Sequence, residues 1–144
     1  MSKVEDAIST FKNDFNCAQS VLSTFSTQYG LDRNIALKIS TGFGGGMGRL
    51  GNTCGAVTGA FMVIGLRYGM GINNGNSAKE KTYELIREFS HRFQNINRSL
   101  ICKELLGCDI STHDGIEYFK QNSLFEKKCI QYVKNAVEIL EKIL

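Results

Sequence analysis

The stretch from Gly42 to Gly71 constrains the fold more than any other part of the chain. Its first ten residues, GFGGGMGRLG, contain six glycines, so they cannot supply the side chains of a hydrophobic core. Glycine reaches positive φ without strain and lets other groups approach closely, which favours a loop here. The residues that follow, Cys54 to Tyr68, are nearly all apolar and carry no charge before Arg67. This run is typical of a helix buried on all sides at the centre of a helical domain.

The apolar run is too short to cross a bilayer. Fifteen helical residues span roughly 22 Å at about 1.5 Å per residue, whereas a membrane helix needs roughly 20 apolar residues. The chain has 144 residues, which suits one domain, residues 1–144, with its own core. It contains no proline, and β-branched alternation is scarce. We therefore expect an all-α, single-domain helical bundle whose buried central helix follows a glycine-rich loop.

Charge and composition narrow the class of partner. The net charge of +3 is scattered rather than gathered in a Lys/Arg block, which argues against nucleic acid or an acidic membrane surface as a partner. The first residues, MSKVEDAIST, lack the apolar core of a signal peptide, so we expect a cytoplasmic protein. In a reducing compartment, five cysteines indicate redox or metal chemistry rather than structural disulfides.

The apolar helices could bury their surface within one chain or share it across a homodimer.

Cys54 stands where the glycine-rich loop becomes the central helix. With Asn52 or Thr53 as the N-cap, Cys54 is expected in the first turn, where backbone N–H groups and the helix dipole favour an anion. A thiol in that position has a lowered pKa and a larger thiolate fraction.

One face of the central helix is formed by small residues alone. A neighbouring backbone or a ligand can approach closely along such a face. The pattern predicts either a tight helix crossing with a buried cysteine or a ligand site. The residues of this face are Gly55, Ala56, Gly59 and Ala60.

Two other cysteines begin a helix only if the apolar stripes around them are interrupted. Asn16 can cap a helix that starts with Cys17; if one continuous helix runs through this segment instead, Cys17 lies on its exposed side. Ser99 can likewise cap a short helix that holds Cys102; if the preceding long helix continues, Cys102 lies opposite its apolar stripe. Both alternatives are compatible with the sequence.

Cys129 lies near the start of the last predicted helix, beside Lys127 and Lys128. These two cations would favour a thiolate. The four cysteines that can be placed near helix starts are separated by 37, 48 and 27 residues, which match no local C-x-x-C pattern. A helical bundle can nevertheless bring such distant positions into one site.

Caps and turn residues predict where the remaining helices begin and end. A helix that leads into the glycine loop is capped by an aspartate, and a long helix follows the polar turn around residues 73–76. Asparagines near the end of that long helix are poor helix formers and could interrupt it. The predicted starts are Asp32, Ser77, and Ser111 or Thr112; the predicted ends are Gly30 and Gly107; the interrupting residues are Asn95 and Asn97.

Five segments combine into a specific pattern: NCAQSVL (16–22), GFGGGMGRLGNTCGAVTGA (42–60), GLRYG (65–69), CKELLGCD (102–109) and FEKKC (125–129). Together they resemble a family of redox-active proteins named for four cysteines around a CGAxxG motif, written C_GCAxxG_C_C. The resemblance covers nearly the whole chain. It implies that Cys17 is the first cysteine, that the motif is Cys54, Gly55, Ala56 and Gly59, that Cys102 and Cys129 are the last two, and that Cys108 is an extra cysteine.

The resemblance implies a redox role but little mechanism. The cysteine domain of this family is similar to part of the split-Soret cytochromes, for which an iron–sulfur role has been considered. The chain contains no C-x-x-C-H, so covalently bound c-type haem is not expected. An oxidoreductase and an electron carrier both remain open, and the sequence names neither a redox partner protein nor a small-molecule substrate.

Three functions follow as hypotheses. In a dithiol protein, Cys54 would be the attacking thiolate and one of the other three cysteines would resolve the disulfide. In an iron–sulfur protein, all four thiolates would hold the cluster, with glycine-loop N–H groups on its sulfurs; structural zinc on the same ligands is a variant. In a non-catalytic module, the loop and the helix N-terminus would take up an anion or cofactor, although the phosphate-loop and dinucleotide patterns are absent. The candidate cofactor-binding glycines are Gly44, Gly45, Gly46, Gly55 and Gly59.

Overall fold

The structure is a computed structural model that describes residues 1–144. It is built from eight α-helices without a β-strand, which confirms the all-α prediction. Two 3₁₀ segments, η1 (Thr27–Tyr29) and η2 (Thr41–Phe43), and one π-helical segment, η3 (Phe125–Cys129), complete the secondary structure. The α-helices are α1 (Lys3–Lys12), α2 (Cys17–Ser26), α3 (Arg33–Ser40), α4 (Gly55–Tyr68), α5 (Asn76–Asn97), α6 (Cys102–Leu106), α7 (His113–Gln121) and α8 (Ile130–Ile143).

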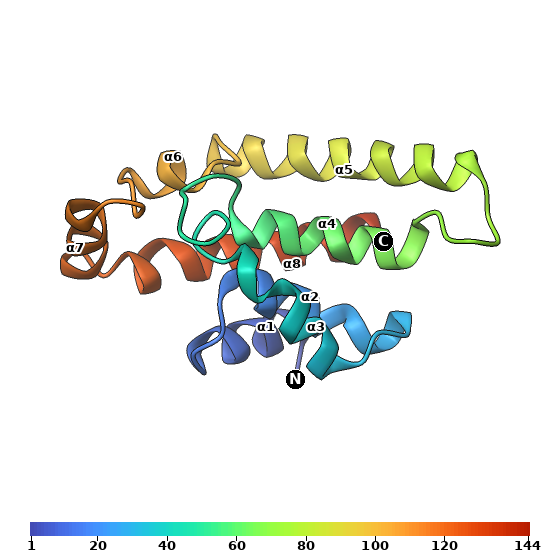
Figure 1. The fold of residues 1–144 in the computed structure, drawn as a ribbon, viewed down its shortest axis with the longest axis horizontal. Coiled ribbons are helices and arrows are strands. Elements are labelled where there is room, and N and C mark those ends of the chain that lie inside the picture. Colours follow the sequence, from blue (N-terminus) through green and yellow to red (C-terminus); the bar gives the residue numbers. More distant parts are fainter.

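The three long helices α4, α5 and α8 pack against one another, and α1, α2 and α3 form a second layer against them (Figure 1). The glycine loop, α6 and α7 lie at one end of this bundle (Figure 1). No helix in the chain is both long and apolar enough to span a bilayer.

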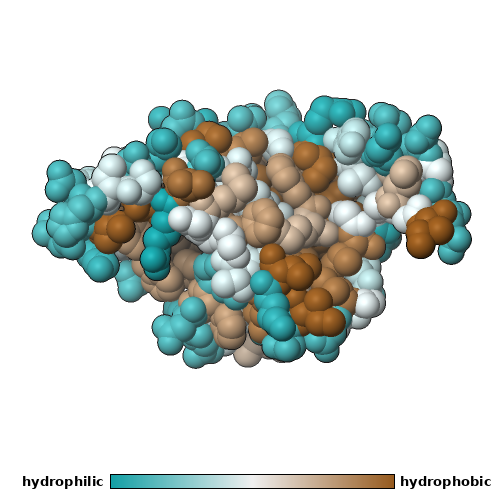
Figure 2. All heavy atoms as spheres, in the orientation of Figure 1, coloured by the Kyte–Doolittle hydropathy of each residue, from teal (hydrophilic) through white to brown (hydrophobic).

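Helix α4 is the central helix that the sequence predicts, since it contacts α2, α5 and α8. Val57, Ala60 and Ile64 are fully buried. One strip is less covered, because Phe61 and Leu66 are only partly buried, so burial is not complete on every side. Apolar surface is accordingly visible over this helix (Figure 2).

The small face of α4 accommodates a close crossing by α2. A β-carbon added at Gly59 would lie 2.8 Å from the Ala18 carbonyl oxygen, and one added at Gly55 would lie 2.5 Å from Cys17 Sγ. Real β-carbons do not approach other atoms this closely, so only glycine permits the crossing. Of the two uses predicted for this face, the structure shows the tight helix crossing.

The N-terminal helix is interrupted, as the capping alternative predicts. Asp14 lies in the break with φ 70°, and α2 begins at Cys17. The Asn16 side chain accepts a hydrogen bond from Gln19 N, and the Gln19 side chain accepts one from Asn16 N. This reciprocal pair is a capping box, so a single continuous helix through this segment is excluded.

The glycine loop contains a left-handed turn. Five consecutive residues, 45–49, have φ between 58° and 68°. Left-handed backbone costs about 1–2 kcal/mol for each residue with a β-carbon, which accounts for glycine at three of these five positions. Hydrogen bonds close the turn on itself: Gly48 N donates to Gly42 O at 2.8 Å, and Asn52 N donates to Gly46 O at 2.9 Å.

The start of α4 differs from its prediction. Its N-cap is Cys54 rather than Asn52 or Thr53, because both of these residues belong to an extended segment that pairs with residues 100–102. Thr53 forms an isolated antiparallel bridge with Ile101. Cys54 N donates to Leu100 O at 2.8 Å, and Cys102 N donates to Asn52 O at 2.6 Å.

Other predicted helix ends are confirmed or corrected by their capping contacts. Asp32 and Thr112 are N-caps whose side chains accept a backbone hydrogen bond, so Thr112 rather than Ser111 starts its helix. Gly30 and Gly107 are left-handed C-caps, as predicted. Two predicted caps are wrong, because α5 is capped by Gly75 rather than Ser77 and α6 by Ile101 rather than Ser99. Asn95 does not interrupt α5, whereas Asn97 is its last residue, and Cys102 begins the short helix of the second alternative.

The crossing of α2 and α4 predicts opposite effects for two glycines of the same helix. Gly59→Ala would force the Ala18 backbone away and should destabilise the fold by about 1–3 kcal/mol. Gly65→Ala is the control, because a β-carbon there meets no atom within 4 Å. It should leave stability unchanged or raise it by about 0.5–1 kcal/mol through lower backbone entropy. Urea unfolding followed by circular dichroism measures both; equal stability of the two variants would contradict the close crossing.

Candidate thiol site

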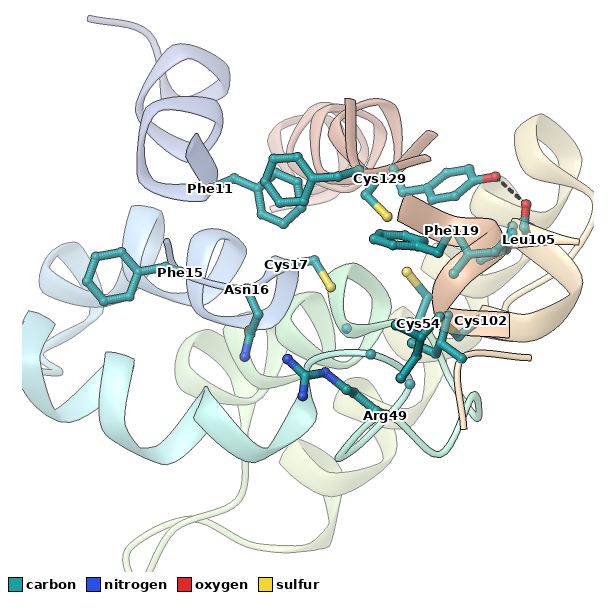
Figure 3. Close-up of a pocket in the computed structure, with 18 of the residues that line it drawn as sticks. Phe11, Phe15, Asn16, Cys17, Arg49, Cys54, Cys102, Leu105, Phe119 and Cys129 are labelled. Carbon is teal, nitrogen blue, oxygen red and sulfur yellow. Dashed lines mark hydrogen bonds between the residues drawn. The ribbon is translucent and has the colours of Figure 1, made fainter. Parts of the chain in front are cut away.

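Four of the five cysteines line one cavity with a volume of about 380 Å³ (Figure 3). We call it the thiol cavity. Its sulfurs come from four separate segments: the start of α2, the N-cap of α4, the start of α6 and the end of η3. The structure therefore gathers Cys17, Cys54, Cys102 and Cys129, while Cys108 does not line the cavity.

Cys17 is the first residue of α2 and is partly exposed. The neighbouring Cys54 thiol lowers the pKa of Cys17 to about 7, against the opposing effect of burial. Backbone N–H groups of Gly45 and Ala18 lower this pKa further. The thiolate of Cys17 is thus stabilised by a neighbouring thiol, by the glycine loop and by the N-terminus of its own helix.

Cys54 is the buried member of this pair, with 7% of its surface exposed. Its interaction with the neighbouring Cys17 thiol, followed by burial, raises the pKa of Cys54 well above that of a free thiol. The lowered pKa expected at Cys54 is therefore wrong. At Cys54, the N-cap of α4, the backbone N–H of Ala56 lowers the pKa but is outweighed by Cys17 and burial; at Cys17, in the first turn of α2, the backbone contributions accompany a net lowering.

Cys102 and Cys129, like Cys54, have raised pKa values. Burial, together with the Cys17 charge, raises the pKa of Cys102 to about 12 and also raises the pKa of Cys129. The expectation that lysines favour a thiolate at Cys129 is wrong, because burial dominates. Lys128 points elsewhere: its Nζ donates to Leu105 O at 3.3 Å.

Cys129 faces the cavity from a π-helical segment. Ile130 N donates to Phe125 O, five residues earlier, and the helix then continues as α8. Leu124 is already helical, so Cys129 lies inside a continuous helix rather than at a free N-terminus. Single π-turns within α-helices occur frequently at functional sites.

The predicted cofactor-binding glycines separate into two groups. Gly45, Gly46 and Gly55 line the thiol cavity, whereas Gly44 and Gly59 do not. Gly44 accommodates the Asn16 side chain, and Gly59 serves the helix crossing described above. Neither Gly45 N nor Gly46 N donates to another backbone group, which leaves both N–H groups available to the cavity.

Several residues of the cavity were not singled out by the sequence. Phe119 of α7 covers the sulfurs (Figure 3). The Tyr132 hydroxyl donates to Leu105 O at 2.8 Å, and burial raises the pKa of Tyr132 to about 12. Arg49 and Asp14 also line the cavity, both at positive φ. Among these residues, only Arg49 could have been noticed in the sequence, because it is the single charged residue between Gly42 and Gly51.

The cavity thiols do not converge on a single point. No three cysteine, histidine, aspartate or glutamate side chains are arranged to ligate one metal ion. A mononuclear zinc site needs four ligands around one centre, so these residues as placed do not fit zinc.

The lowered pKa of Cys17 predicts a pH profile for its alkylation. Because the thiolate is the nucleophile, its rate with iodoacetamide should rise with pH and reach half of its maximum near pH 7. Cys54→Ala removes the donor and should move this midpoint upward, whereas Cys54→Ser keeps a hydroxyl donor and should move it less. Peptide mass spectrometry measures modification at Cys17; identical midpoints in wild type and Cys54→Ala would show that Cys54 does not lower the pKa of Cys17.

Comparison with known proteins agrees with this arrangement of cysteines. The family model described as "Putative redox-active protein (C_GCAxxG_C_C)" matches residues 15–143, which include all four cysteines of the cavity. No curated protein and no solved structure matches the chain. Because the family model covers most of the sequence, the chain belongs to the C_GCAxxG_C_C family of redox-active proteins.

Proposed function

We propose that the protein carries out thiol–disulfide exchange with Cys17 as the attacking thiolate and Cys54 as the resolving thiol. One observation carries the proposal: Cys17, a partly exposed residue at a helix start, lines the same cavity as the buried Cys54, whose thiol lowers the pKa of Cys17. Exchange requires these two elements, an accessible stabilised thiolate and a second thiol beside it.

The roles follow from the surroundings of each sulfur. Cys17 reaches the cavity beside Gly45, whose N–H group favours its anion. Cys54 holds its proton at neutral pH, and Gly55, the next residue in the chain, lies against the Cys17 sulfur. A disulfide that enters the cavity therefore meets Cys17 as a thiolate and Cys54 as a protonated thiol. This order reverses the roles expected from the sequence.

The exchange balances without a further reactant. The Cys17 thiolate attacks one sulfur of a disulfide; a Cys17–sulfur bond forms, the substrate S–S bond breaks, and one thiolate leaves and takes a proton from water. Cys54 then loses its proton and attacks the Cys17 sulfur, which releases the second thiolate to take up a proton. The substrate gains two electrons and becomes two thiols, while Cys17 and Cys54 become a disulfide.

A second candidate is an iron–sulfur protein, favoured by the presence of four thiols on one cavity where exchange needs two. The donor set fits, because cluster thiolates bind different irons and need not converge on one point. Cys17, Cys54, Cys102 and Cys129 would hold the cluster, and the free Gly46 N–H would face its sulfurs. When bound, a cluster would supply one-electron transfer.

Purification without oxygen distinguishes the two candidates. Exchange predicts colourless protein that reduces a small disulfide stoichiometrically and acquires a Cys17–Cys54 disulfide, detected by peptide mass spectrometry. Cys17→Ser and Cys54→Ser should each abolish formation of this disulfide, and Cys108→Ser is the matched control because Cys108 lies outside the cavity. Brown protein with stoichiometric iron and sulfide, together with no exchange at Cys17, would overturn the proposal in favour of the cluster.

A further inference from the structure

A second hollow of about 430 Å³ lies beside the thiol cavity and is lined by no hydrophobic residue. We call it the polar hollow. It shares four residues with the thiol cavity: Asp14, Asn16, Gly45 and Arg49. The two spaces therefore meet where Cys17, the partly exposed thiol, borders the glycine loop.

Arg49 is an unpaired cation on this shared boundary. Its guanidinium makes no hydrogen bond or ion pair with the rest of the chain; the single salt bridge joins Arg92 and Glu88. Its backbone has φ 62° within the left-handed turn, and its side chain folds back over Gly45. The guanidinium lies on the same side as Asn16 and Cys17 (Figure 3).

The other polar side chains of the hollow already have partners. Asn16 Nδ2 donates to Thr41 O at 2.8 Å, and Gln19 Nε2 donates to Leu37 O at 2.9 Å. Asp14 supplies one carboxylate but forms no ion pair with Arg49. Arg49 is thus the charged donor that remains free to bind a ligand.

We infer that the polar hollow binds the carboxylate of a small disulfide, and that Arg49 holds this carboxylate while the attached sulfur reaches Cys17. The guanidinium fork matches a carboxylate with two parallel hydrogen bonds. The inference rests on the proposed exchange and adds the class of substrate: a low-molecular-weight disulfide with a carboxylate close to its sulfurs. The bonds made and broken are those of the exchange described above.

Two disulfides of similar size and different charge test the inference with the reduced full-length protein. Dithiodiglycolate carries a carboxylate on each half, and bis(2-hydroxyethyl) disulfide is neutral. The measured quantity is the ratio of their rate constants for forming the Cys17–Cys54 disulfide. Arg49→Gln should lower this ratio by about fivefold through loss of one nearby charge, and added salt should lower it in wild type but hardly in the variant.

Arg98→Gln is the matched control, because Arg98 is also an exposed arginine at positive φ, 75°, and lines neither space. Arg49→Asn, a residue that tolerates positive φ, should repeat the effect of Arg49→Gln with an intact fold by circular dichroism. An unchanged ratio in both Arg49 variants, or an equal fall in Arg98→Gln, overturns this inference alone. Failure of wild-type Cys17 to exchange with either disulfide overturns the proposed function and this inference with it.

Discussion

The contact between α2 and α4 is the interaction on which the rest of the site depends. Gly55 and Gly59 remove the side chains that would hold the two helices apart, so the first turn of α2 rests directly on the start of α4. This contact places Cys17 beside Cys54 and brings Gly45 within reach of the Cys17 sulfur. A pair of thiols with opposite protonation preferences follows from one helix crossing.

The other two sulfurs reach the cavity by different means. The bridge between Thr53 and Ile101 joins two chain segments that are distant in sequence, and it places Cys102 next to the start of α4. The π-turn before α8 directs Cys129 to the same space. Four thiols are thus brought together by the α2–α4 crossing, the Thr53–Ile101 bridge and the π-turn. No short cysteine motif is needed, which explains why their spacing along the chain resembles no metal-binding pattern.

The sequence predicts the helices and several caps of this fold, because periodicity and capping are local. Asn16, Asp32 and Thr112 cap as expected, and the glycine loop adopts the positive φ values that its composition favours. The protonation states could not be predicted in the same way. They depend on burial and on the approach of Cys54 to Cys17, which are tertiary facts. The N-cap at Cys54 could not be predicted for the same reason. It depends on the bridge to residues 100–102, which are remote in sequence.

The π-helical segment also makes the position of Phe125 relative to the fourth thiol sensitive to chain length. A π-turn accommodates one more residue than an α-turn does, and each residue advances a helix by about 100°. Removing one residue between Phe125 and Cys129 would convert the segment to regular helix. All residues of α8 could then keep their orientation toward α1 and α5, while the residues before the deletion would rotate relative to them. Evolutionary loss of a single codon there would therefore change how the Phe125 ring lies relative to the Cys129 sulfur. The hydrophobic face with which α8 packs against the bundle would be retained.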